Sequence, residues 1–184
     1  MKFESLGAEE KKMIKHVEKN NIFVLETKSF HYVLGIDGEG FNRHIHWGEK
    51  CDVNDYEFEA VHGISSNDPA LNGIKQEITP FGSTMYRECD IKARFEDCCR
   101  EIFLVYKGFE QNGDTLKLHF EDEYYPLGVT LCYEVFEEYD IIKRYVTLTN
   151  TGSDDIVFER IFSAEFTLPS SEPYTFRNTN GTYG

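Results

Sequence analysis

The segment VTLCYEVFEEY at residues 129–139, followed by IIKRYVTLTN at residues 141–150, decides the fold class. Apolar and polar residues alternate in these runs, as in β-strands, where successive side chains point to opposite faces of a sheet. In the first run, one face carries Val129, Leu131, Tyr133, Val135 and Glu137, and the other carries Thr130, Cys132, Glu134 and Phe136. Because apolar residues occur on both faces, we predict a thick sandwich whose outer side is also partly covered.

Short alternating runs of this kind, separated by turn residues, begin at Asn21. The other predicted strands lie at 22–27, 31–36, 41–47, 91–95, 101–110, 115–123 and 156–168. The clusters Gln111-Asn112-Gly113-Asp114 and Asn150-Thr151-Gly152-Ser153-Asp154 indicate hairpin turns. About ten strands at this spacing, with no helix between them, predict an all-β fold, a large antiparallel sandwich over residues 21–184.

The first twenty residues have a different pattern. In SLGAEEKKMIKHVEKN (5–20), Ser5 is a potential N-cap and acidic residues precede basic ones, as the helix dipole favours. Leu6, Met13, Ile14 and Val17 form a narrow apolar stripe. We therefore predict a short N-terminal helix, an extension over residues 1–20 that packs on the sheet.

The charge and cysteine content of the chain limit the partners and the cellular location that we expect for it. A net charge of −14 argues against nucleic acid and anionic membranes as partners, because both attract Lys and Arg. The charge leaves sugars and other uncharged small molecules open. The sequence has no signal peptide pattern and no apolar run long enough to span a membrane. Its five cysteines are odd in number and lack CxxC spacing, so we expect reduced thiols and a cytoplasmic location.

Catalytic and metal motifs are weak in this sequence. His44-Ile45-His46 would place two imidazoles on the same strand face, but no third ligand is nearby, so we predict no metal and no cofactor. Carboxylates are abundant, yet spacing selects no acid–base pair and no catalytic residue. The residues alone leave three hypotheses: a carbohydrate-binding or interaction module, an enzyme in its own right, or part of a larger enzyme.

Three segments together resemble the N-terminal domain of family 36 glycoside hydrolases, the α-galactosidase family. They are NIFVLETKSFHYVLGI with GFNRHIHWGEK, then IKQEITPFGSTMYRECDIKAR, and GVTLCYEVFEEYDIIKRYVTLTNTGSDDIVFERIFSAEFTLP. The resemblance implies a β-supersandwich that precedes a (β/α)₈ barrel holding the two catalytic aspartates. We therefore expect the N-terminal part of an enzyme that hydrolyses terminal α-galactosides, supporting the barrel and mediating homo-oligomer contacts. By itself, this chain should be inactive.

The resemblance also implies two substrate-binding residues. Tyr183 follows Gly181 and Thr182 where the family has a tryptophan that lines the galactose pocket. Asp55 precedes the Gln76-Glu77 pair, as does a family aspartate that binds sugar hydroxyls. The sequence departs from the family pattern at Met85, at Cys89 and at Ile78-Thr79, which makes the broader glycosidase assignment more secure than α-galactosidase specificity.

Overall fold

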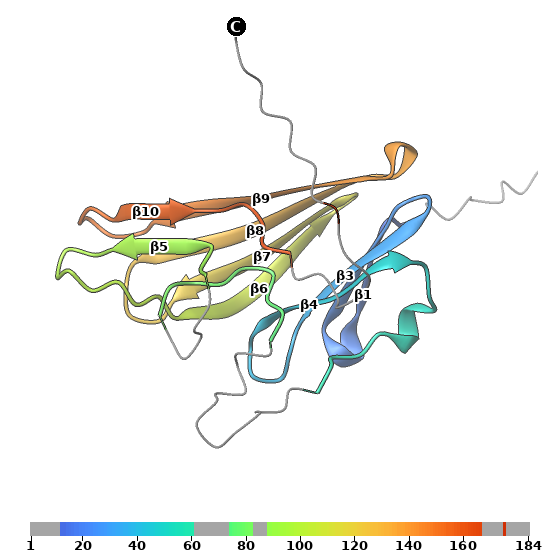
Figure 1. Cartoon of the computed structure of the whole chain (residues 1–184), viewed down its shortest axis with the longest axis horizontal. Coiled ribbons are helices and arrows are strands. Elements are labelled where there is room, and N and C mark those ends of the chain that lie inside the picture. The colour runs from blue at the N-terminus through green and yellow to red at the C-terminus, as the bar shows by residue number, and fades with distance from the viewer. Residues whose placement is uncertain (1–11, 61–73, 83–87, 167–174, 176–184) are drawn as a thin grey trace, which may run out of the picture.

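The structure is a computed structural model that describes residues 12–60, 74–82, 88–166 and 175. Two four-stranded antiparallel sheets face each other, and a two-stranded ribbon adjoins them (Figure 1). The predicted all-β antiparallel sandwich is confirmed. Among the described residues, no helix has the length and apolar character needed to cross a membrane.

The first sheet is a meander of consecutive strands in the order β1-β2-β3-β4. Its strands are β1 (Ile14–Val17), β2 (Ile22–Glu26), β3 (Phe30–Ile36) and β4 (Asn42–Glu49). The register of β3 against β4 shifts between Val33 and Leu34, opposite Ile45. Such a bulge changes which face of the sheet the following side chains occupy.

The second sheet contains the stretch that decides the fold, in the order β6-β7-β8-β9. Its strands are β6 (Leu104–Asn112), β7 (Thr115–Asp122), β8 (Leu127–Phe136) and β9 (Ile141–Asn150). The hairpin predicted at residues 111–114 is confirmed: it joins β6 to β7, with Gly113 at a φ of 57°. That positive φ is the reason glycine suits this turn.

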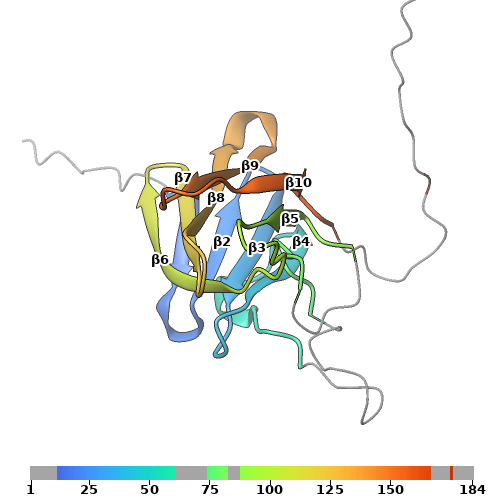
Figure 2. The same cartoon turned by 90° about the vertical axis from the view of Figure 1, so that its left-hand side faces the viewer.

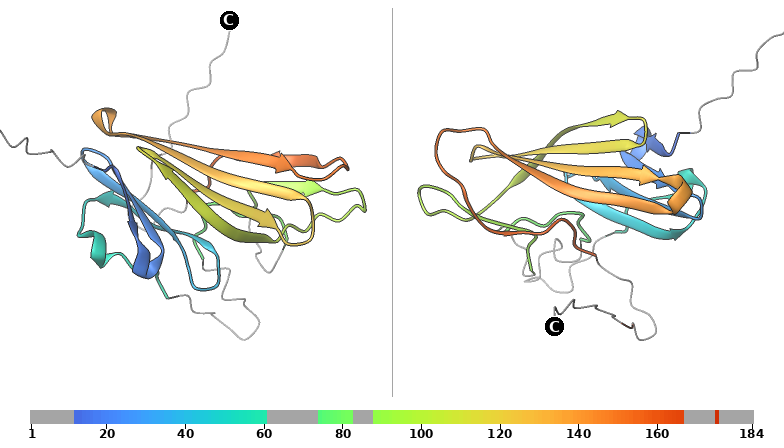
Figure 3. Two further views of the ribbon diagram at one scale, coloured as in Figure 1. Left: turned by 180° about the vertical axis from the view of Figure 1, so that it is seen from behind. Right: turned by 90° about the horizontal axis from the view of Figure 1, so that it is seen from above.

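The two-stranded ribbon pairs β5 (Ile91–Arg94) with β10 (Val157–Ile161). Figures 1 and 3 show the ribbon at the end of the long strands that is distant from β1, and in the end-on view of Figure 2 β5 and β10 face the viewer. The hairpin predicted at residues 150–154 is therefore wrong, because β10 pairs with β5 and not with β9. Local turn residues mark where the chain bends, but they do not say which strand it joins next.

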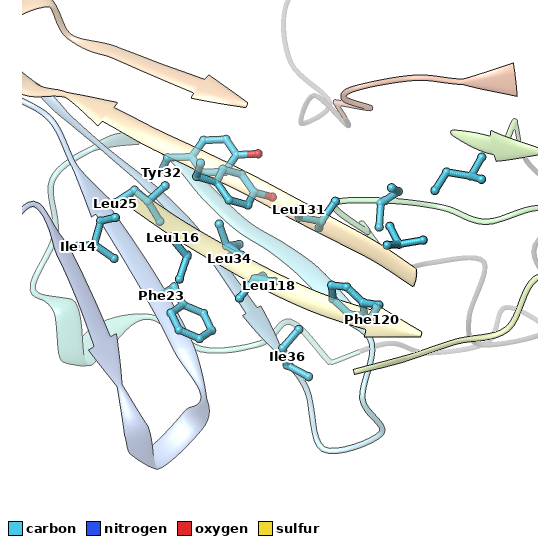
Figure 4. Close-up of a cluster of buried hydrophobic side chains, with 14 of the residues drawn as sticks. Ile14, Phe23, Leu25, Tyr32, Leu34, Ile36, Leu116, Leu118, Phe120 and Leu131 are labelled. Atoms are coloured by element: carbon cyan, nitrogen blue, oxygen red, sulfur yellow. The ribbon is translucent and has the colours of Figure 1, made fainter. Parts of the chain in front are cut away.

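The main core lies between the sheets (Figure 4). The first sheet contributes Ile14, Phe23, Leu25, Tyr32, Leu34 and Ile36, and the second contributes Leu116, Leu118, Phe120, Val129, Leu131, Tyr133 and Val135. The apolar face predicted for β8 is confirmed, since Val129, Leu131, Tyr133 and Val135 are all buried. Ile91 and Ala93 extend this core to the ribbon.

A smaller apolar cluster covers the opposite face of the first sheet. Ile22, Val24 and Val33 pack there against Tyr56, which directly follows a short 3₁₀ helix, η2 (Val53–Asp55). The segment around η2 therefore lies over the outer face of the sheet.

The predicted N-terminal helix is wrong over the residues the structure describes; residues 1–11 lie outside them. Ile14–Val17 form β1, which pairs with β2, and Glu18–Asn20 form the 3₁₀ turn η1 between the two strands. Ile14 is buried in the main core, and His16 stacks on Phe23 with ring centroids 4.5 Å apart. The open edge of β2 provides cross-strand contacts that outweigh the local helix propensity.

Candidate functional site: a buried charge cluster beneath an aromatic pocket

Residues 74–82 attach to the edge of the first sheet beside β4. The backbone N–H of His44 donates to the carbonyl of Lys75 at 2.7 Å, and the N–H of Ile78 donates to Asn42 Oδ1 at 2.8 Å. These two contacts fix the two intervening residues, Gln76 and Glu77, and Glu77 lies between the sheets. Glu77 is charged and yet completely buried beside the apolar core.

The Glu77 carboxylate accepts hydrogen bonds from three side chains on three strands. Tyr32 Oη of β3 donates to both carboxylate oxygens at 2.9 Å, and Tyr133 Oη of β8 donates at 2.6 Å. His44 Nδ1 of β4 lies 2.8 Å from Oε1. An ionised carboxylate only accepts, so Nδ1 bears the proton. Glu77 thereby links both sheets.

Arg144 of β9 supplies the opposite charge. Its Nη1 lies 3.1 Å from Glu77 Oε2, and its Nη2 donates to the Glu77 backbone carbonyl. The guanidinium also lies over the Tyr133 ring, 5.7 Å from the centroid, and only 7% of the side chain is exposed. Hydrogen bonds satisfy the Glu77 carboxylate, whereas Nε and Nη1 of the buried Arg144 have no hydrogen-bond partner among the described residues.

Shifts in pKa follow from these contacts. Burial by itself would raise the pKa of Glu77, but the His44 hydrogen bond and the Arg144 charge outweigh burial and hold that pKa below its ordinary value. Burial and the adjacent Glu77 charge raise the pKa of both Tyr32 and Tyr133. The tyrosines therefore stay protonated as donors while Glu77 stays ionised.

A pocket of about 290 Å³ opens above this cluster. Its lining consists of Phe30, Tyr32, Trp47, Tyr133, Asp140, Ile141, Ile142, Arg144 and Phe166. The rings of Trp47 and Phe166 contact each other, with centroids 5.5 Å apart, and about half of each side chain is exposed. The pocket is therefore a mostly aromatic and aliphatic hollow above a charged base.

The bulge in β4 separates the two histidines that we predicted to share a strand face. His44 pairs opposite Leu34 and contacts Glu77 on the core side, whereas His46 pairs opposite Val33 and contacts the Tyr56 ring on the outer side. The predicted shared face is wrong, because the extra residue, Ile45, breaks the two-residue period. Within the described ranges, no group of three or more His, Cys, Asp or Glu side chains could hold a metal ion.

Of the two predicted sugar-binding residues, the structure describes only Asp55, which does not line this pocket. Asp55 ends η2 and is exposed, on the segment that covers the outer face of the first sheet. Tyr183 lies outside the residues that the structure describes. The donors around Glu77 hold its carboxylate in the ionised form at the base of the pocket.

Comparison with known proteins identifies the family. The sequence model described as the glycosyl hydrolase family 36 N-terminal domain matches residues 40–184. The chain belongs to this family. Among curated relatives, the family 36 chain is 29% identical over 171 residues to a bifunctional alpha-galactosidase/sucrose kinase, AgaSK, of Mediterraneibacter gnavus, covering 78% of this chain and 18% of that protein. It is 24% identical over 194 residues to alpha-galactosidase AgaA of Geobacillus stearothermophilus, covering 86% and 26%.

Solved structures agree with this assignment. The galactosidase domain of AgaSK superposes with a TM-score of 0.70 at 26% identity, covering 82% of this chain and 25% of that one. The family 36 alpha-galactosidase AgaB of Geobacillus stearothermophilus also gives a TM-score of 0.70, at 21% identity, covering 82% and 24%, and this shows a common fold. The chain therefore spans about a quarter of the length of these structures.

The resemblance in the sequence pointed to Gln76-Glu77 as a family motif, but not to its physical role. No signal in the sequence marked Glu77 as buried, because it directly follows the polar residues Lys75 and Gln76. The predicted alternation placed Tyr133 on the same strand face as Val129, Leu131 and Val135, and a buried tyrosine hydroxyl needs a partner. Nothing in the sequence indicated that Arg144 would be the counter-ion of Glu77, since these two residues are 67 positions apart.

Proposed function

We propose that this chain is the N-terminal β-sandwich domain of an α-galactosidase-like glycoside hydrolase. The match of residues 40–184 to the family 36 N-terminal domain is the observation that carries the proposal. Alpha-galactosidases with 24–29% identity over most of the chain support it. Residues 21–184, together with β1, would form one domain, and a (β/α)₈ barrel elsewhere in the enzyme would supply the catalytic aspartates.

The substrate class we propose is terminal α-galactosides. Crystal structures of AgaA variants, related at about 20% identity, were solved in complex with raffinose and with stachyose. Within such an enzyme, the sandwich would support the barrel and take part in homo-oligomer contacts. Asp55 and Tyr183 remain our proposed contacts to the sugar. The five cysteines, all unpaired, are consistent with a cytoplasmic location.

The test is to determine the coding sequence after codon 184 and to assay the complete product. We expect hydrolysis of p-nitrophenyl α-galactoside and of raffinose, and no hydrolysis by the 184-residue chain alone. A complete product that cleaves no α-galactoside would contradict the proposal, as would a coding sequence that stops directly after residue 184.

A carbohydrate-binding module is the second candidate. The half-exposed Trp47 beside a pocket favours it, because sugar rings stack on such side chains. Calorimetry of the 184-residue chain with galactose and raffinose distinguishes the two candidates. Heat of binding at millimolar sugar, lost in Trp47→Ala, would support the module.

A further inference from the structure

Arg144 carries buried donors for which the described part of the chain supplies no acceptor. Its side chain is 7% exposed, so more than nine-tenths of it is withdrawn from solvent. Nη2 donates to the Glu77 backbone carbonyl and Nη1 forms an ion pair with Glu77 Oε2, yet Nη1 and Nε make no hydrogen bond. Arg144 also lines the pocket above the cluster. Because an unsatisfied buried donor is costly, a ligand oxygen that accepts from Arg144 would be stabilised there.

The other walls of the pocket are suited to the apolar face of a ligand. Trp47 and Phe166 line it with ring centroids 5.5 Å apart, and their side chains are 53% and 52% exposed, so both rings are accessible for stacking. Phe30, Ile141 and Ile142 complete the apolar lining. Small-molecule sites combine walls of this kind with a few polar groups that fix the orientation of the ligand.

The charges around the pocket favour an uncharged ligand. The Arg144 guanidinium is already balanced by the buried Glu77 carboxylate. A second carboxylate, that of Asp140, also lines the pocket, and the hydrogen bond from the backbone N–H of Ser29 lowers its pKa and keeps it ionised. An anion would therefore meet two carboxylates and one guanidinium. Because an ionised carboxylate accepts several hydrogen bonds, Asp140 is also an acceptor for a ligand hydroxyl.

The size of the pocket limits the ligand to about one ring. Its volume of about 290 Å³ is at the lower end of small-molecule sites, which are about 300–1,000 Å³. The ligand needs an apolar face for the aromatic walls, an oxygen that accepts from Arg144 and a hydroxyl that donates to Asp140. A hexopyranose has all three, because its C–H groups form an apolar face and its hydroxyls both donate and accept.

We infer that the pocket lined by Trp47, Phe166 and Arg144 binds a single neutral hexopyranose, with its C–H face on the two aromatic rings and one of its oxygens accepting from Arg144. This inference rests on the second candidate function above, the carbohydrate-binding module, and gives it a ligand size, charge and orientation. Arg144 is then a specificity-determining residue, because it favours a ligand with an oxygen at the base of the pocket over a hydrocarbon of the same shape. The contacts with Glu77 hold its guanidinium in this position.

Trp47 reports on the pocket directly, because it is the only tryptophan in the chain. We expect methyl α-D-galactopyranoside to change the fluorescence of the 184-residue chain saturably, with a dissociation constant of about 1–10 mM, since a single ring makes few contacts. Phe166→Ala should weaken this binding about fivefold by removing one stacking wall. Phe162→Ala is the matched control and should leave binding unchanged, because Phe162 is 50% exposed and does not line the pocket.

Arg144→Lys tests the polar contact. The variant keeps a cation beside Glu77 but removes Nε, so the sugar should bind about tenfold more weakly, as expected when a hydrogen bond from a charged donor is lost. Circular dichroism checks that the variant is folded. If it is not, the pair Phe166→Ala and Phe162→Ala decides the question, since both side chains are half exposed.

The contrary outcomes overturn the inference in distinguishable ways. Heat of sugar binding in calorimetry without a change in Trp47 fluorescence, or equal weakening by Phe162→Ala and Phe166→Ala, would reject this pocket and keep the module. No heat and no fluorescence change at tens of millimolar sugar would reject both. Tighter binding of D-galacturonate, the same ring with a carboxylate, would show that the pocket takes anions instead. None of these results affects the first candidate function, which the assay of the complete product decides.

Discussion

Two glutamates in the first-sheet region have low pKa values for different reasons. Glu77 is completely buried, and its partners are the buried Arg144, two tyrosines and His44. Glu26 is also buried, with 11% of its side chain exposed, but its partners extend into solvent: Lys15 Nζ is 2.8 Å from one carboxylate oxygen and Lys50 Nζ is 3.0 Å from the other. These lysine side chains are 45% and 30% exposed.

The two sites represent two kinds of charge pair. The contacts of Glu77 hold the two sheets together, whereas those of Glu26 involve lysines that water reaches. Burial acts to raise the pKa of Glu26, but the hydrogen bonds from Lys15 and Lys50 lower it to about 2. Because water and salt surround the lysines, this attraction is screened. At Glu77, no solvent can replace a lost partner, so removing one leaves an uncompensated buried group. The two sites should therefore respond very differently to matched substitutions.

The largest effect is expected from Glu77→Gln. The substitution leaves Arg144 buried without a counter-ion, and breaking such a pair costs about 3–5 kcal/mol of the free energy of unfolding. Urea denaturation followed by circular dichroism measures this loss. Glu59→Gln is the matched control, because Glu59 pairs with Lys75 but is 72% exposed, and a change within about 0.5 kcal/mol is expected. Equal losses in the two variants would refute the comparison.

An intermediate effect is expected from Tyr133→Phe. The ring continues to fill the core, but Glu77 loses its shortest donor, at 2.6 Å. A hydrogen bond to a charged group contributes about 1.5–3 kcal/mol, so the free energy of unfolding should fall by that amount. Tyr139→Phe, at a side chain that is 70% exposed, should change stability negligibly in the same denaturation series. A loss as large as that of Glu77→Gln would mean that the hydroxyl, and not the ion pair, dominates the cluster.

The smallest effect is expected from Glu26→Gln. At pH 7 this variant should lose about 1 kcal/mol or less, because pairs with exposed lysines are weak. The Glu26 pKa is lower in the folded chain than in the unfolded chain, so its contribution is present above pH 4.5 and disappears as the pH falls towards about 2. The stability difference between wild type and variant should therefore shrink over that range and also in 1 M NaCl. A difference that is constant with pH would assign the effect to packing.

Much of the fold was predictable from the sequence because strand alternation and turn residues are short-range patterns. The alternation in β8 correctly placed Val129, Leu131, Tyr133 and Val135 on one face, since the two-residue period of a strand is a local property, and all four are buried. The turn at Gly113 was also predictable from its residues. The family itself was indicated by three segments whose order and spacing run through most of the chain.

The tertiary structure alone decided which segments meet. Residues 14–17 have a helical pattern, yet they form β1 because the edge of β2 offers pairing. β10 joins β5 across about 65 residues, and a one-residue bulge sends His44 and His46 to opposite faces. The Glu77 cluster draws its members from β3, β4, β8 and β9, which are distant in sequence. Long-range contacts of this kind depend on the geometry of both sheets together, so no local pattern specifies them.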